Sequence, residues 1–216
     1  MSTTAGRGEH WWPVASAVLV TAGLHAALPD RYRVQPTWLV PAVMVTLLAA
    51  LIAGDPGRID NQRSWLRVVT ALIIVGITGA NLAAAGRLVR DIITGSKTFS
   101  HSPGGLLATG TVVWLTNIVA FALWFWALDG GGAAARAKQP NRDPAFVFPE
   151  MQSDYVPEGW TPKFVDYLSL GFWTATAFSP TDVSAIKGWA KLLMMVEAFA
   201  SLAIAAVVIA RAINVL

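Results

Sequence analysis

Side chains with hydroxyl and carboxyl oxygens gather in one short stretch of the sequence, between two apolar segments. They are Thr174, Thr176, Ser179, Thr181 and Asp182. Side-chain and backbone oxygens are the groups that line ion paths in membrane proteins. Residues 174–182 are therefore the candidate functional segment, and the rest of the chain must supply the elements that position them.

The composition predicts that most of the chain lies in a lipid bilayer. Of its 216 residues, 55% are hydrophobic and 13% are charged. Soluble proteins carry about 25% charged residues. The mean hydropathy of +0.52 and the ten tryptophans point the same way. We expect a polytopic α-helical membrane protein.

Several functional classes are disfavoured by what the sequence lacks. It has no cysteine, which excludes disulfides, thiolate catalysis and cysteine-ligated metal centres. It shows no glycine-rich phosphate loop, nucleophile elbow or paired-carboxylate motif. The net charge of +3 comes from Lys and Arg that lie mostly between apolar runs, where membrane topology explains them. We expect no enzyme activity, no cofactor, no metal site and no nucleic-acid partner.

Five apolar runs are close to the length of a spanning helix, which is about 20 residues. They are residues 12–28, 37–53, 65–85, 105–128 and 189–213. A signal peptide is the competing interpretation of the first run. Because Glu9 and His10 abut that run and no small-residue cleavage site stands clear of Asp30, we favour a retained span. The fold class is therefore all-α with about five transmembrane helices.

The runs divide the chain into three parts. Residues 1–128 form a four-helix transmembrane region, and residues 164–216 carry the candidate functional segment and the last span. Between them, residues 129–163 form an extramembrane loop rich in Pro and Gly, which we call the cap. Its aromatic side chains predict that it packs on the rest of the protein. They are Phe146, Phe148, Tyr155 and Trp160.

The apolar segment 164–177 is predicted to be a helix that is too short to span. Pro162 precedes it and Asp166 lies in its first turn, where a carboxylate is favoured. Fourteen residues extend about 21 Å, compared with roughly 30 Å of hydrocarbon. A polar stretch and a full span follow. This order is the arrangement of a re-entrant pore loop, because irregular backbone at membrane depth must be buried in protein or line a wet cavity.

Residues 164–213 resemble the pore module of potassium-channel-type tetrameric cation channels. In that family a short helix leads into a filter and then into an inner helix. The segment aligned with the filter is Thr176-Ala177-Phe178-Ser179-Pro180-Thr181-Asp182. In the inner helix, Glu197 stands four residues before the small Ser201, which is similar to the family pattern. The whole chain also resembles an uncharacterised family of bacterial multi-pass membrane proteins, through Phe146-Val147-Phe148-Pro149 and a similar span order.

The sequence departs from the potassium filter at three positions. Ser179 and Thr181 replace its two glycines, and Pro180 replaces its aromatic residue. Glycine reaches backbone angles that Ser and Thr adopt reluctantly, and proline fixes its own φ. The resemblance therefore implies a wider, hydrated and weakly selective path for monovalent cations, lined by the hydroxyls and a ring of Asp182. A pore loop that seals is the alternative.

Conduction requires oligomers, since one loop per chain cannot enclose a pore, and the resemblance implies a homotetramer. A bacterial plasma membrane is the expected location, and counts of Lys and Arg leave the orientation open. A non-conducting scaffold or accessory subunit is the alternative function, and a small-solute transporter is third, because no internal repeat is visible.

Three polar residues are predicted inside the spans. Glu197 could line a pore, or it could bond backbone or hydroxyl groups behind the short helix, and we favour the second role. Asn81 and Asn117 are expected to form hydrogen bonds between helices.

Overall fold

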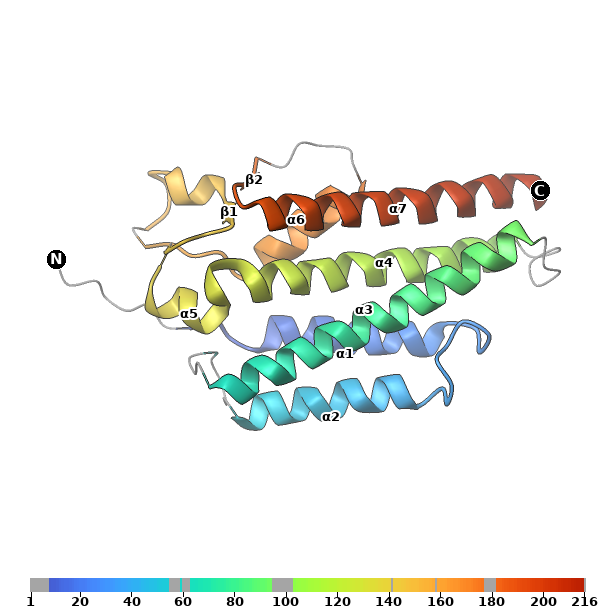
Figure 1. Ribbon diagram of the computed structural model, residues 1–216, viewed down its shortest axis with the longest axis horizontal. Helices are drawn as coiled ribbons and strands as arrows, with labels where there is room; N and C mark the ends of the chain where they lie inside the picture. The colour runs from blue at the N-terminus through green and yellow to red at the C-terminus, as the bar shows by residue number, and fades with distance from the viewer. Residues whose placement is uncertain are drawn as a thin grey trace.

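The computed structural model describes residues 8–54, 59, 63–94, 103–140, 142–157, 159–176 and 182–215. In these residues the protein is all-α apart from one pair of two-residue strands. Five longer helices run roughly along the long axis of the molecule, with α3 crossing obliquely (Figure 1). They are α1 (Trp12–Ala27), α2 (Leu39–Gly54), α3 (Ser64–Ile93), α4 (Pro103–Leu128) and α7 (Gly188–Val215).

The remaining elements are short and belong to the cap or to the candidate functional segment. The cap holds a 3-10 turn, η2 (Asp129–Gly131), then α5 (Ala133–Lys138), β1 (Phe146–Val147) and a second 3-10 turn, η3 (Pro149–Gln152). After the cap come α6 (Phe164–Thr176) and β2 (Ser184–Ala185). In Figure 1, α5 and β1 lie at the end of the molecule where α1 and α7 begin.

Three of the five long helices have the length and apolar composition needed to cross a membrane. They are α3, α4 and α7. The helices α1 and α2 are equally apolar but have 16 residues each, about 24 Å of helix. All five predicted helices form, so the all-α class is confirmed. Three of them could cross a membrane by length and composition, and a count of five spans stays a prediction.

The helix α3 extends further than the sequence analysis predicted. We expected its end near residue 85, before the charges at 87–91, but it continues to Ile93. Asp91 explains the continuation, because its carboxylate accepts hydrogen bonds from Arg31 at 2.5 Å and from the Tyr32 hydroxyl at 2.9 Å. These bonds fasten the last turns of α3 to the loop between α1 and α2.

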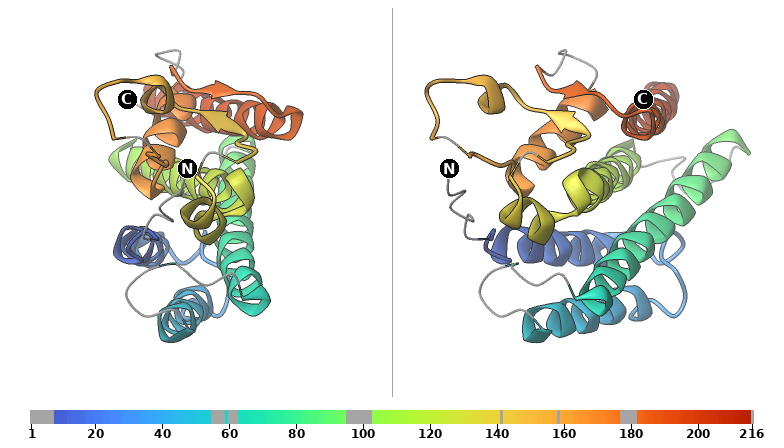
Figure 2. Two further views of the ribbon diagram at one scale, coloured as in Figure 1. Left: turned by 90° about the vertical axis from the view of Figure 1, so that its left-hand side faces the viewer. Right: turned by 60° about the vertical axis from the view of Figure 1, so that its left-hand side comes forward.

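The central element is α4, which contacts α1, α3, α6 and α7. Figure 2 shows α4 between α1 on one side and α7 on the other. Over an apolar stretch of 18 residues in each helix, the buried share is 61% for α4, compared with 33% for α3 and 22% for α7. The helix α7 therefore covers α4 with one face and leaves most of its surface uncovered.

Candidate functional site

The short helix α6 begins at the cap and packs between α4 and α7. It has 13 described residues, about 20 Å of helix, up to Thr176, and the last residue of the predicted helix, Ala177, lies outside the described residues. Five predicted site residues lie outside the residues that the structure describes, namely Ala177, Phe178, Ser179, Pro180 and Thr181. Thr174, Thr176 and Asp182, which flank them, are described.

The two threonines at the end of α6 direct their hydroxyls to their own helix. Thr174 Oγ1 donates to the carbonyl of Leu170 at 2.8 Å, and Thr176 Oγ1 donates to the carbonyl of Trp173 at 3.1 Å. Each hydroxyl oxygen keeps its capacity to accept. Asp182 is exposed on the other side of residues 177–181. The described part of the segment thus offers two hydroxyl oxygens and one carboxylate.

Glu9 fixes the beginning of α6, although it precedes α6 by more than 150 residues. Its Oε1 accepts from the backbone N–H of Phe164 at 2.6 Å, and its Oε2 accepts from the indole of Trp126 at 2.9 Å. Asp166 adds a second acceptor for the first turn, at 2.8 Å from the N–H of Lys163. The backbone N–H groups at the start of a helix have no partner within it, and carboxylates there are stabilising.

Burial raises the pKa of Glu9 above its ordinary value of 4.5, although the hydrogen bonds from Phe164 and Trp126 oppose the shift. Burial also raises the pKa of Asp166 above 3.8. The folded protein therefore binds the carboxyl protons of Glu9 and Asp166 more tightly than the unfolded chain does. This stabilises the fold at low pH, and the stabilisation is lost as the pH rises through the raised pKa values.

We therefore expect the Glu9→Gln variant to show a weaker pH dependence of stability than the wild type. The unfolding temperature of the wild type should rise as the pH falls from about 7 to about 5. Because the glutamine amide does not titrate, this rise should be smaller in the variant. Tryptophan fluorescence during heating in detergent measures this rise. An equal reduction in Asp154→Asn, which alters an exposed carboxyl of the cap, would contradict the assignment to Glu9.

A second carboxylate, Asp129, joins α4 to α6 and to the cap. It is fully buried, its Oδ1 accepts from the N–H of Ala145 at 2.5 Å, and its Oδ2 accepts from the hydroxyl of Tyr167. Buried Arg136 lies beside it and donates to the backbone carbonyls of Trp126 and Asp129, at 2.8 and 2.6 Å. The Arg136 guanidinium carbon also stands 5.0 Å above the ring of Tyr167. This network ties the first turns of α6 to the end of α4.

The strand pair holds the chain just after Asp182. β1 and β2 are antiparallel, with Phe146 opposite Ala185 and Val147 opposite Ser184. Lys187 adds an ion pair with Asp143 of the cap at 2.6 Å. The chain therefore leaves the cap as α6 and is back at the cap by β2, and α7 begins there.

Phenylalanines of the cap pack as the sequence predicted. Phe146 is fully buried against Phe125, Tyr167 and Trp189, with ring centroids 5.1 to 6.3 Å apart. Phe148 is 3% exposed and contacts Trp160. The prediction was wrong for Tyr155, which is 97% exposed because it lies in the turn that follows η3.

Polar side chains connect three helices in the interior, as predicted for Asn81 and Asn117. Asn81 Nδ2 donates to Asn117 Oδ1 at 3.4 Å, and Asn117 Nδ2 donates to the hydroxyl of Ser201 at 3.0 Å. All three side chains are buried. The predicted hydrogen bonds between helices are confirmed, and Ser201 is their third member.

Glu197 lies one turn before Ser201 and is also fully buried. A Cβ placed on Gly171 would come within 3.3 Å of Glu197 Oε1, so the carboxyl lies directly behind α6. This is the location we favoured, and burial within one chain does not fit the pore-lining alternative. The expected hydrogen bonds are missing: among the described residues, neither carboxyl oxygen has a partner.

The close approach at Gly171 predicts that Gly171→Ala destabilises the protein. The new methyl would stand 3.2 Å from the carbonyl oxygen of Ile118 and 3.3 Å from Glu197 Oε1, so these neighbours must give way by a few tenths of an ångström. We expect a loss of about 1–3 kcal/mol, measured by unfolding in mixed micelles. Gly76→Ala is the matched control, since nothing lies within 4 Å of its added methyl. Equal losses in the two variants would contradict this packing.

Sequence reasoning missed Glu9, Asp129 and Arg136, which position α6. The available signal was the location of Asp129 directly after an apolar run and before three glycines.

Within the part of the chain that the structure describes, no group of three or more His, Asp or Glu residues could hold a metal ion. Comparisons with protein-family models, with curated proteins and with solved structures found no match to this chain.

Proposed function

We propose that the chain is the subunit of a homo-oligomeric, channel-like membrane protein that conducts monovalent cations with weak selectivity. One observation carries the proposal. The helix α6 is too short to span, and the chain leaves the cap and returns to it within residues 164–185. A segment that enters and returns on one side of a membrane, and is followed by a full span, is a re-entrant loop.

The cap supports this proposal by fixing both ends of the loop. Glu9 and Asp129 hold the start of α6, and the β1–β2 pair holds the chain just after Asp182. Residues that coordinate ions must be held close to their working geometry. Four such loops around an axis would place hydroxyls of 174–181 along a hydrated path, with a ring of Asp182 at its mouth.

The uncovered surfaces of α6 and α7 support oligomerisation. An apolar stripe follows α7 at helical spacing, on residues that are 53–76% exposed: Leu192, Met195, Val196, Phe199, Leu202, Ile209 and Ile213. Phe172 and Trp173 are exposed on α6. In the proposed tetramer, neighbouring subunits meet through these faces, in the plasma membrane of a bacterium and with α1 and α2 completing five spans.

Asp182→Asn is expected to weaken the preference for cations. A ring of carboxylates at a pore mouth raises the local concentration of cations, and the amide removes that charge. The reversal potential under a salt gradient should move toward zero. Asp154→Asn, which removes an exposed carboxylate of the cap, should leave the reversal potential unchanged. If both variants behave like the wild type, Asp182 does not lie at the mouth of a path.

A non-conducting scaffold or accessory subunit is the second candidate. The apolar stripe on α7 favours it equally well, because a different protein could cover that face. Mass measurement in native detergent separates the two functions. A stable homotetramer supports the channel, whereas a monomer or a complex with another protein supports the scaffold.

A further inference from the structure

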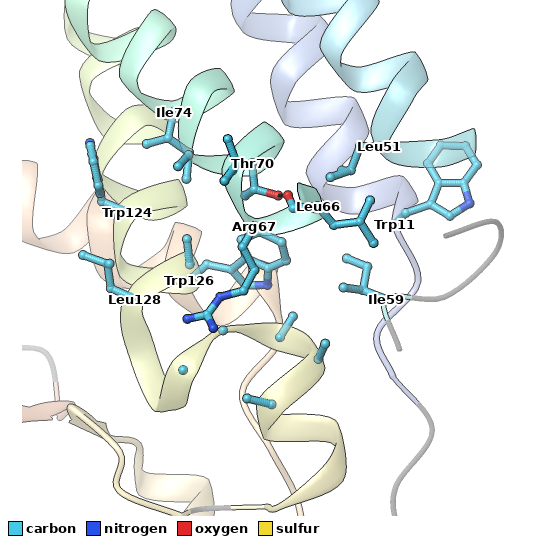
Figure 3. Close-up of a pocket in the computed structure, with 18 residues that line it drawn as sticks. Trp11, Leu51, Ile59, Leu66, Arg67, Thr70, Ile74, Trp124, Trp126 and Leu128 are labelled. Atoms are coloured by element: carbon cyan, nitrogen blue, oxygen red, sulfur yellow. Dashed lines mark hydrogen bonds between the residues drawn. The ribbon is translucent and has the colours of Figure 1, made fainter. Parts of the chain in front are cut away.

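A cavity of about 500 Å³ lies where the start of α3, the end of α4 and the cap helix α5 meet (Figure 3). This volume is within the range of small-ligand sites. Its walls are mostly apolar and include the side chains of Trp11, Leu51, Ile74, Trp124 and Trp126. It does not involve α6, α7 or the segment between them.

Two of the tryptophans that line the cavity have their indole N–H groups bonded within the protein. The indole N–H of Trp124 donates to Thr78 at 3.0 Å, and that of Trp126 donates to Glu9 at 2.9 Å. Thr70, which also lines the cavity, donates its hydroxyl to the carbonyl of Leu66 at 2.9 Å. These donors are therefore already used within the protein.

Arg67 is the charged side chain among the described residues that line the cavity. Figure 3 shows its guanidinium directed toward the corner between α4 and α5. Within the described ranges, no carboxylate forms an ion pair with Arg67 and no acceptor takes a hydrogen bond from its side chain. A guanidinium offers five donors in a planar fork that matches a carboxylate or a phosphate.

We propose that this cavity binds an amphiphile with an anionic head group, with the head at Arg67 and the apolar tail along the tryptophan-lined wall. The cavity lies at the ends of two candidate spans, α3 and α4. Trp and Arg side chains at such ends lie at the level of lipid head groups. A free fatty acid and an anionic phospholipid share this chemistry, and the site does not depend on conduction.

Equilibrium binding to the delipidated full-length chain in a neutral detergent tests the proposal. The probes are oleate, phosphatidylglycerol and, as the zwitterionic comparison, phosphatidylcholine. Arg67→Gln removes the charge, and Ala71→Phe fills the cavity. Arg63→Gln, just before α3, and Leu72→Phe are the matched controls. Arg63 and Leu72 are exposed, as Arg67 and Ala71 are, but they do not line the cavity.

The wild type should bind one equivalent of an anionic probe and prefer it to phosphatidylcholine. Arg67→Gln should weaken that binding by roughly tenfold, the value of one charged hydrogen-bonded contact. Ala71→Phe should weaken it further, and both controls should bind as the wild type does. Binding of oleate alone assigns a free fatty acid, and binding of phosphatidylglycerol assigns a membrane lipid. Absence of saturable binding, equal affinity for phosphatidylcholine, or equal effects of Arg67→Gln and Arg63→Gln would overturn the proposal.

Discussion

Replacing Asp129 with asparagine is expected to lower the free energy of unfolding by about 3 kcal/mol. The carboxylate is fully buried and accepts from the N–H of Ala145 and from the hydroxyl of Tyr167. An asparagine has one acceptor oxygen, so its NH₂ group must face one of these two donors. The substitution also removes the negative charge that lies beside buried Arg136.

The matched control for this prediction is Asp143→Asn, which makes the same chemical change on the surface of the cap. The carboxylate of Asp143 is 79% exposed and forms an ion pair with Lys187. Exposed pairs contribute about 0–1 kcal/mol. Asparagine also tolerates the positive φ of 54° at this position. Unfolding in mixed micelles measures both variants, and similar losses would show that the buried network does not hold α6.

Replacing Glu197 with methionine is expected to raise the free energy of unfolding by about 1–3 kcal/mol. The carboxyl is fully buried, and neither oxygen has a hydrogen-bond partner among the described residues. Burial of a polar group without a partner is costly, and an apolar side chain of similar length removes that cost.

Ser201→Ala, one turn further along α7, is expected to have the opposite sign. The serine hydroxyl accepts from Asn117 Nδ2 at 3.0 Å, and its loss leaves a buried donor unpaired. The expected destabilisation is about 1–3 kcal/mol. The same unfolding assay compares the two variants. A marked loss of stability in Glu197→Met would show that the carboxyl has a partner in the assembled protein.

The positions of the helices could be predicted from the sequence because apolar runs and their polar boundaries are local signals. This holds for α6, which begins at the predicted residue, and for Asn81 and Asn117, whose amides form the predicted hydrogen bonds between helices. The end of α3 was predicted too early, because charges were interpreted as a boundary. Asp91 stays in the helix since Arg31 and Tyr32, from another loop, satisfy it.

The groups that hold α6 could not be predicted, because they are far apart in the sequence. Glu9 contacts Phe164 and Trp126, and Asp129 contacts Ala145 and Tyr167. Acidic residues of this kind are usually solvated, and only the packing of the cap shows that Asp129 is buried and Glu9 half-buried. The orientation of Glu197 toward α4 and α6 also depends on packing, since the same residue could face outward on a helix. The role of the Ser179 and Thr181 hydroxyls in lining an ion path stays a prediction, because residues 177–181 lie outside the described residues.

Current recording across planar bilayers that contain the purified protein tests the central claim most directly. The proposed re-entrant loop predicts stepwise currents in the wild type, with a reversal potential that favours cations weakly over anions. Protein-free bilayers are the baseline. If neither the wild type nor Asp182→Asn shows current above that baseline, residues 174–182 do not form a conducting path and the channel proposal is wrong.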